Sequence, residues 1–308
     1  MEVTTLMAKK VLCVLSEYGF WGEELVGPLE SLDAHGYEVV FASSTGRRPP
    51  ALPPSMDSSY VDPPLGRPVT SSDMATKTKA WNQSERLAKP VSLKQWVPEK
   101  PYRASPDYLR EQEAYNNRID EISQELDQYA ALLIVGGSGP IVDMVNNSRV
   151  HELILDFYRK NKPIAAECYG VACLAFARSE EDRKSIIWGR HVTGHPIEYD
   201  YHDGTGFVGT DLNMGPPPYP LEYILRDAVG PEGQFHGNVG HETSVVVDYP
   251  FITGRSTADS VLTGKMLIEV LEEGRLYYGW RGPDRVGTPQ LPKSAKANGR
   301  KAAVAAGS

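Results

Sequence analysis

The chain has 308 residues, a formal net charge of −8, 41% hydrophobic and 23% charged residues. This composition is typical of a soluble globular protein, and the length suffices for one large α/β domain with insertions. An acidic chain without a basic stripe argues against a nucleic-acid-binding protein. No apolar run approaches the roughly 20 residues that span a bilayer, so we expect no membrane partner. The N-terminus lacks a secretory signal pattern, and three cysteines form no disulfide framework, so we expect a cytoplasmic protein.

The first 45 residues alternate between strand and helix patterns. Residues 10–16 are an apolar, β-rich run, residues 23–35 carry apolar side chains at helical spacing, and residues 37–43 read as a second strand. Gly36 ends the helix between the two strands. A strand–helix–strand opening predicts a doubly wound, mostly parallel sheet flanked by helices, as in flavodoxin-like α/β proteins.

The same rhythm returns later in the chain. Helices are predicted at 106–128, 149–161 and 256–274, and strands at 130–135, 164–166, 243–249 and 251–254, with a short strand and loop over 186–196.

Two Pro-rich segments break this rhythm. We expect residues 46–105 to be irregular and, because they are rich in Trp and Tyr, to form either a cap over the site or a partner-contact arm. We expect residues 198–240 to be a second irregular insertion. Its Asp and His residues match no metal-ligand spacing, so we expect solvated loop residues and no metal; they are Asp200, His202, Asp203 and Asp211. Residues 281–308 are expected to form a disordered tail, which leaves one domain over 1–280.

The most informative stretch is 163–178, PIAAECYGVACLAFAR. A buried strand, an abrupt turn at Cys168 and a small-residue helix have the layout of a nucleophile elbow. A thiol at a helix N-terminus faces the positive end of the helix dipole, which favours the thiolate, so we expect Cys168 to be catalytic. Cys13 and Cys173 fit the ordinary pattern of buried core cysteines.

Three motifs together resemble the ThiJ/PfpI superfamily. They are the Gly-rich turn in LIVGGSGPIVD (133–143), the elbow AAECYG (165–170) and the closing segment VVDYPFITG (246–254). The resemblance implies a fold like that of the class I glutamine amidotransferases. Within the superfamily, the chain looks most similar to the larger chaperone, glyoxalase III and deglycase branch.

The resemblance also implies a set of site residues. It places Glu24 beside the nucleophile Cys168, as a buried carboxyl group that is partly protonated and donates a hydrogen bond to the thiolate. The chain departs from the family pattern with Tyr169 directly after the nucleophile and Ser138 in the Gly-rich turn, where His is usual. The imidazole role then falls to His195 in VTGHP (192–196).

The leading functional hypothesis is a cofactor-free thiol enzyme that converts an α-oxoaldehyde to a hydroxy acid. His195, or Tyr169 as the weaker base, would move the proton, and the N–H groups of Gly137 and Tyr169 would hold the oxyanion, with Ser138 beside them. One alternative is a hydratase or hydrolase of a nitrile, isocyanide or amide carbon. Another is a stress-response chaperone or redox sensor. The expected partner is a small molecule, and the resemblance implies a homodimer.

Overall fold

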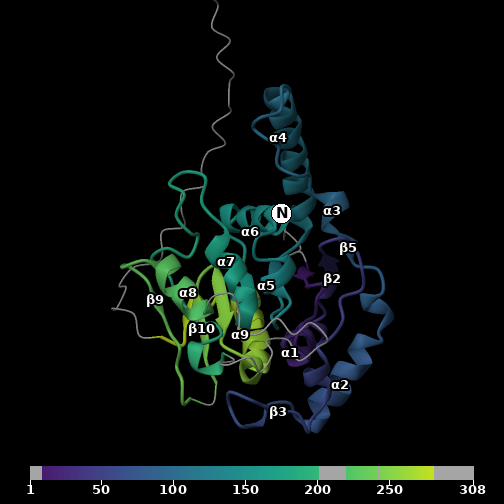
Figure 1. Ribbon diagram of the computed structural model, residues 1–308, viewed down its shortest axis with the longest axis vertical. Coiled ribbons are helices and arrows are strands. Elements are labelled where there is room, and N and C mark those ends of the chain that lie inside the picture. Colours follow the sequence, from purple (N-terminus) through teal and green to yellow (C-terminus); the bar gives the residue numbers. More distant parts are fainter. Residues whose placement is uncertain (1–8, 201–219, 242, 281–308) are drawn as a thin grey trace, which may run out of the picture.

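The computed structural model describes residues 9–200, 220–241 and 243–280. A β-sheet lies at its centre, with helices around it (Figure 1). The sheet has eight strands in the order β12-β10-β11-β7-β6-β1-β2-β5. These strands are β1 Lys10–Val14, β2 Glu38–Ser43, β5 Val91–Ser92, β6 Ala131–Ile134, β7 Ile164–Glu167, β10 Val245–Asp248, β11 Phe251–Gly254 and β12 Tyr277–Tyr278. Two small two-stranded sheets pair β3 Val61–Asp62 with β4 Arg67–Pro68, and β8 His191–Val192 with β9 Gln234–Phe235.

Most of the sheet is parallel, as the sequence predicts. β5, β2, β1, β6, β7 and β11 run in one direction, and β10 is antiparallel to both β11 and β12. In β1, Val11 and Cys13 face one hydrophobic cluster while Leu12 and Val14 face another. Strand side chains alternate between faces, so this double burial explains the continuous apolar sequence of the strand.

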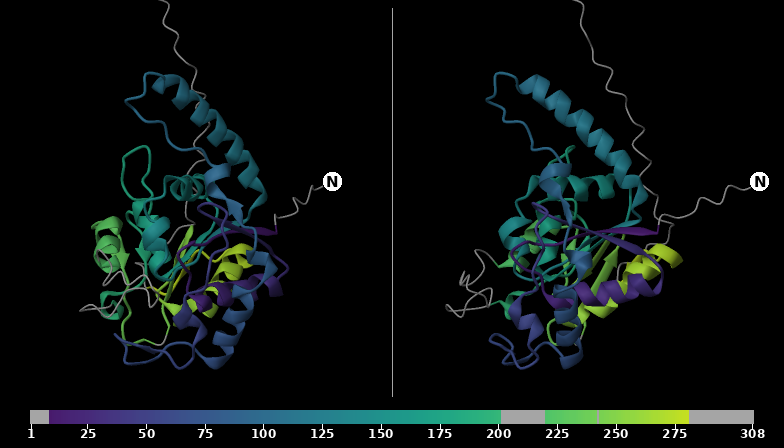
Figure 2. Two further views of the ribbon diagram at one scale, coloured as in Figure 1. Left: turned by 45° about the vertical axis from the view of Figure 1, so that its right-hand side comes forward. Right: turned by 90° about the vertical axis from the view of Figure 1, so that its right-hand side faces the viewer.

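Helices cover both faces of the sheet. Their bounds are α1 Gly22–Ala34, α2 Ser72–Asn82, α3 Leu93–Trp96, α4 Tyr108–Glu125, α5 Pro140–Asp143, α6 Ser148–Arg159, α7 Ala172–Phe176, α8 Leu221–Val229 and α9 Ser260–Glu273. Helices α1 and α9 pack together over one face, and α6, α7 and α8 cover the other. Helix α4 projects from the body of the molecule (Figure 2).

The prediction of an irregular segment over 46–105 is wrong in part, because it contains α2, α3 and three short strands. Helix α2 starts where the Ser71 hydroxyl accepts a hydrogen bond from the Met74 N–H, which is a standard helix cap. Its Ala75 and Thr78 are buried, and the helix packs against α1. A local cap and a buried helix face therefore stabilise a helix in a segment whose many prolines predict irregular structure.

The prediction of a second irregular segment over 198–240 also needs correction, because its described part contains α8 and β9. The short strand predicted within 186–196 is confirmed at His191–Val192. Residues 186–188 form a turn, which ends at Gly189 with φ +73°. Of the acidic and His residues predicted there, His202, Asp203 and Asp211 lie outside the described residues, as does the predicted tail.

The remaining predicted helices and strands are confirmed within a few residues of their bounds. Both insertions pack against the α/β body, since β5 extends the edge of the large sheet and α8 packs against α7. A single domain over residues 1–280 stays a prediction. No helix in the described part of the chain is long and apolar enough to cross a membrane.

Candidate active site

Cys168 lies at a sharp turn where β7 meets a helix. Glu167 still has extended backbone, with φ −130° and ψ 150°, while Cys168 has a left-handed φ of +50°. A non-glycine residue in this region carries backbone strain that the surrounding structure must compensate. Strained φ values of this kind cluster at functional turns, and this one lifts the Cys168 side chain above the end of the sheet.

The Gly-rich turn after β6 lies directly against Cys168. A Cβ added at Gly136 would come within 2.3 Å of a Glu24 oxygen and 2.9 Å of the Cys168 Cβ. Gly137 has φ +91°, and a Cβ there would meet the Trp21 nitrogen at 2.5 Å. The turn therefore needs glycine, because its backbone passes between α1 and the nucleophile.

His195 contacts the sulfur of Cys168, and Asp200 lies beyond the imidazole. The Cys168 Sγ is 3.4 Å from His195 Nδ1. His195 Nε2 is 3.2 Å from Asp200 Oδ1, an ion-pair distance that lies off the line of a good hydrogen bond. Sulfur, imidazole and carboxylate thus follow one another in a row, which is the order of groups in a Cys–His–Asp arrangement.

Tyr169 fixes this arrangement from one side. Its phenol donates a hydrogen bond to Asp200 Oδ1, and its ring stacks on the His195 imidazole with 4.3 Å between ring centroids. The prediction of Asp200 as a solvated loop residue is wrong, because the residue is only 4% exposed. The reason is the tertiary contact with Tyr169 and His195, which no spacing in the sequence reveals.

Glu24 is fully buried in the first turn of α1, next to Cys168. Burial raises the pKa of Glu24 to about 8, although its interactions with the Cys168 side chain and the Gly137 N–H act in the opposite direction. Neither carboxyl oxygen has a hydrogen bond of good geometry within the described residues. A protonated Glu24 is thus placed to donate to a thiolate formed on Cys168.

The sequence-based prediction of an acidic thiol is wrong for the resting site. Burial, followed by the Glu24 carboxylate, raises the pKa of the Cys168 thiol well above its usual range. The helix after the turn, α7, has only five residues, so its dipole is small. The N–H groups of Tyr169 and Gly137 reach the sulfur and lower the pKa of the thiol in part. Cys168 therefore needs a base within reach, and His195 occupies that position.

Glu167, directly before the nucleophile, is a second fully buried carboxyl group. Burial, followed by the charge of Glu24, raises the pKa of Glu167 well above its usual range. Because the charges of Glu24 and Glu167 interact in a buried site, the two carboxyl groups do not both ionise readily, and burial favours their neutral forms.

A cavity of about 300 Å³ opens above Cys168. All six predicted site residues line it: Glu24, Gly137, Ser138, Cys168, Tyr169 and His195. The Ser138 hydroxyl is buried and has no hydrogen-bond partner in the described part of the chain. An unpaired buried hydroxyl at a cavity wall is available to a bound ligand.

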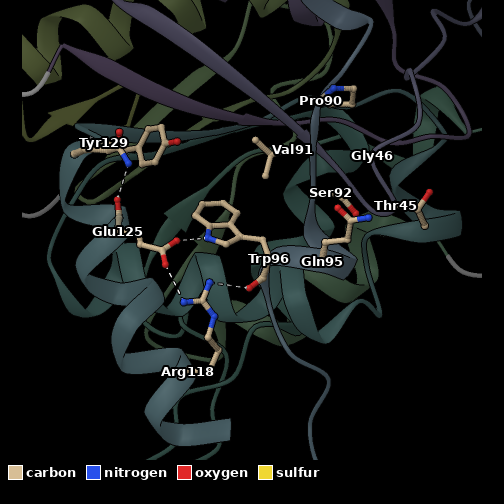
Figure 3. A pocket seen from close by; sticks show the side chains of 11 residues that line it. Thr45, Gly46, Pro90, Val91, Ser92, Gln95, Trp96, Arg118, Glu125 and Tyr129 are labelled. Atoms are coloured by element: carbon tan, nitrogen blue, oxygen red, sulfur yellow. Dashed lines mark hydrogen bonds and ion pairs between the residues drawn. The ribbon is translucent and has the colours of Figure 1, made fainter. Parts of the chain in front are cut away.

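A larger cavity, of about 670 Å³, lies between the β5 edge of the sheet and α4 (Figure 3). Trp96 and Arg118 are held there by hydrogen bonds to Glu125, of 2.5 Å and 2.8 Å. No Cys or His lines this cavity among the described residues, so we place the chemistry in the smaller one.

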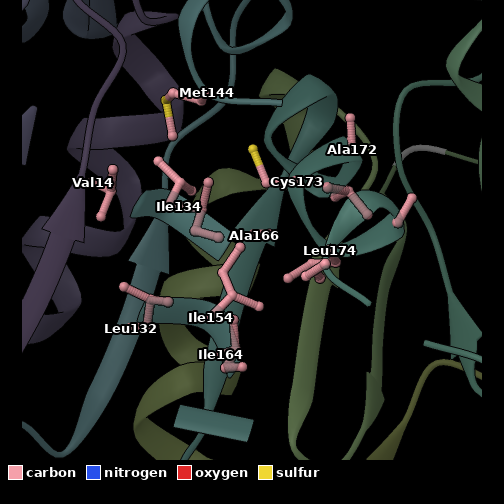
Figure 4. Close-up of a cluster of buried hydrophobic side chains, with 14 of the residues drawn as sticks. Val14, Leu132, Ile134, Met144, Ile154, Ile164, Ala166, Ala172, Cys173 and Leu174 are labelled. Atoms are coloured by element: carbon pink, nitrogen blue, oxygen red, sulfur yellow. The ribbon is translucent and has the colours of Figure 1, made fainter. Parts of the chain in front are cut away.

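The other two cysteines lie in the hydrophobic core. Cys173, in α7, packs among buried aliphatic side chains of the cluster between α7 and the sheet (Figure 4). Cys13 lies in the cluster on the opposite face of the sheet. Burial raises the pKa of Cys173 and of Cys13 far above the usual range. Within the described residues, no three His, Cys, Asp or Glu side chains are grouped as a metal site would require.

Known protein families provide an independent comparison. The family described as ThiJ/PfpI family-like matches residues 15–191, more than half of the chain. The chain belongs to the ThiJ/PfpI-like family. The match includes the Gly-rich turn and the elbow, which carry the sequence resemblance.

The chain is also similar to individual proteins with different names. The chain is 31% identical to glutamine amidotransferase-like class 1 domain-containing protein 1 of Bos taurus, over 44% of this chain and 56% of that protein. It is 26% identical to the protein/nucleic acid deglycase HchA of Pseudomonas aeruginosa, over 60% of this chain and 64% of the deglycase. The aligned region therefore spans less than two thirds of the length of these relatives.

Solved structures of other proteins share the fold of this chain. The Francisella tularensis Rapid Encystment Protein 24 KDa superposes with a TM-score of 0.58 at 22% identity, covering 85% of this chain and 98% of that one. Glyoxalase III from Candida albicans superposes with a TM-score of 0.52 at 17% identity, covering 85% and 97%. These likenesses confirm the doubly wound fold, and the chemistry depends on the site itself.

Proposed function

We propose that this chain is a cofactor-free enzyme in which Cys168 adds to a small electrophilic carbon, that of an α-oxoaldehyde, and releases a hydroxy acid. The observation that carries the proposal is the row from Cys168 through His195 to Asp200, with 3.4 Å and 3.2 Å between successive atoms. The similarity to HchA, a protein named as a protein/nucleic acid deglycase, supports an enzymatic function.

The first step forms a carbon–sulfur bond. The Cys168 sulfur adds to the aldehyde carbon while His195 takes the thiol proton, and Asp200 stabilises the resulting imidazolium. The aldehyde oxygen becomes an oxyanion next to the N–H groups of Gly137 and Tyr169 and is then protonated to give a hemithioacetal. Protonated Glu24 stabilises the sulfur while it is negatively charged.

The next steps move a proton and release the product. His195 removes the proton from the carbon bonded to sulfur, and the neighbouring ketone carbon is protonated, which gives a thioester. Water then cleaves the carbon–sulfur bond, restoring the Cys168 thiol. The aldehyde carbon ends at the acid level and the ketone carbon at the alcohol level, so the sequence needs water but no external oxidant.

His195 favours the oxoaldehyde over the nitrile, isocyanide or amide alternatives. A base in contact with the sulfur is within reach of the carbon that the sulfur attacks, and only the oxoaldehyde reaction requires a proton to leave that carbon. A homodimer and a cytoplasmic location stay predictions.

The test is to incubate the purified chain with methylglyoxal and to measure lactate. We expect lactate from the wild type, no lactate from Cys168→Ser, and unchanged turnover from Cys173→Ser. A wild type that forms no lactate from methylglyoxal but hydrates a nitrile or isocyanide would favour the hydratase. Suppression of aggregation that survives Cys168→Ser, without turnover of any of these compounds, would favour the chaperone.

A further inference from the structure

The cavity over Cys168 has two chemically different walls. The polar wall carries the reacting groups. The apolar wall consists of Trp21, at the start of α1, and four residues of the insertion 46–105, namely Leu52, Pro54, Leu65 and Val69. Tyr199 and Ala258 also line the cavity. The insertion therefore supplies four of the apolar side chains that line the cavity at Cys168.

This apolar wall is fixed in place by hydrogen bonds. The Trp21 indole N–H donates to the Glu23 carboxylate at 2.8 Å, and the Thr70 hydroxyl donates to the same carboxylate oxygen at 3.2 Å. The Leu52 N–H donates to the Phe20 carbonyl at 2.8 Å. The insertion is thus tied at Leu52 to the loop before α1 and at Thr70 to the first turn of α1. A preformed wall costs little ordering when a ligand binds.

The charged residues on the insertion side of the cavity are of both signs. Asp62 and Arg67 face each other across the β3–β4 pair and both line the cavity. A buried arginine, Arg255, also lines the cavity, and its Nε forms an ion pair with an Asp259 carboxylate oxygen at 3.5 Å. Because each of these charges has an opposite charge beside it, they give little preference for a substrate with a net charge. The apolar wall is therefore the feature that distinguishes one substrate from another.

We propose that the substrates of this site are α-oxoaldehydes that carry an aryl or branched-alkyl group, which packs against Trp21 and the insertion residues Leu65 and Val69. The inference rests on the proposed function. A volume of about 300 Å³ is at the lower end of the range of about 300–1,000 Å³ for pockets that hold drug-sized ligands. A methyl substituent would leave most of the apolar wall exposed to water, whereas a ring would cover it.

The kinetic test compares phenylglyoxal with methylglyoxal. We expect kcat/KM of the wild type to be at least about tenfold higher for phenylglyoxal, with mandelate as its product. Leu65→Ala should lower kcat/KM for phenylglyoxal by about tenfold and for methylglyoxal by less than about twofold. The matched control is Val61→Ala, a residue of the same hairpin that is 50% exposed and does not line the cavity, and it should change neither value.

The outcomes separate this inference from the function on which it rests. Turnover of both substrates at similar kcat/KM, or a Leu65→Ala variant that affects both equally, would overturn the inference and leave the proposed function intact. No turnover of either substrate would overturn both.

Alkylation of Cys168 tests the wall without turnover. The measured quantity is the ratio of the alkylation rate with N-benzyl iodoacetamide to the rate with iodoacetamide. This ratio should be higher for Cys168 of the wild type than for glutathione. Leu65→Ala should bring the ratio close to that of glutathione, and Val61→Ala should not. A wild-type ratio equal to that of glutathione would contradict the assigned wall even in an active enzyme.

Discussion

Replacing Asp200 by Asn tests whether the carboxylate acts through His195. The Asp200 Oδ1 is 3.2 Å from His195 Nε2, and both side chains are largely buried, at 5% and 13% exposure. At this distance an ion pair is worth roughly 5 kcal/mol with an effective dielectric constant of about 20. The interaction is complete only when His195 carries the proton of Cys168, so its loss raises the barrier rather than weakening substrate binding.

We therefore expect Asp200→Asn to lower kcat by about 10²–10⁴-fold with KM within about threefold of wild type. The assay is steady-state production of hydroxy acid from methylglyoxal at pH 7. Alkylation of Cys168 by iodoacetamide should slow in parallel, because the same base assists both reactions.

The matched control is Glu198→Gln, an exposed acid in the same turn, which should retain wild-type kinetics. A melting temperature within a few degrees of wild type would exclude unfolding as the cause of the loss. A fall in kcat of less than about threefold in a folded Asp200→Asn variant would refute the role of this carboxylate.

Three further predictions concern protons and thiols. Burial raises the pKa of Glu24 to about 8, so Glu24 is neutral and stabilises the Cys168 thiolate below that pH, whereas above it the charged Glu24 repels the thiolate. We therefore expect kcat/KM to fall as pH rises through 8, and we expect Glu24→Gln to remove this fall. Full-length protein treated with iodoacetamide under native conditions should carry its label on Cys168, with Cys173 labelled only after unfolding; equal labelling of both would contradict the core position of Cys173. Burial raises the pKa of Glu167, so the free energy of unfolding of the wild type should decrease as pH rises above 4.5, the ordinary pKa of a glutamate. In thermal melts from pH 5 to 9, the melting temperature of Glu167→Gln should fall less than that of the wild type. Equal falls in the two proteins would refute a buried neutral Glu167.

The elbow and the parallel sheet could be predicted because their signals are local. Continuous apolar runs such as 131–134 mark strands buried on both faces, and the small residues around Cys168 mark a tight strand-to-helix turn. Ser71 is also a local signal, because its hydroxyl caps the N-terminus of α2, but the prolines of the surrounding segment favoured the prediction of an irregular loop.

Other features depend on contacts between distant parts of the chain. Asp200 becomes part of the site only because Tyr169 and His195 surround it. The raised pKa of Cys168 follows from burial, which a local motif does not report. The insertion was predicted as a cap or an arm, and its apolar side chains at the cavity support the cap.

Proton NMR of the reaction with methylglyoxal in D₂O tests most directly whether Cys168 and His195 act together. We expect lactate that carries deuterium at the carbon bearing the hydroxyl group, because His195 exchanges its proton with solvent during the transfer, and no lactate from Cys168→Ser. Lactate without deuterium at that carbon would contradict proton transfer through His195. Lactate formed equally well by Cys168→Ser would contradict the role of the thiol.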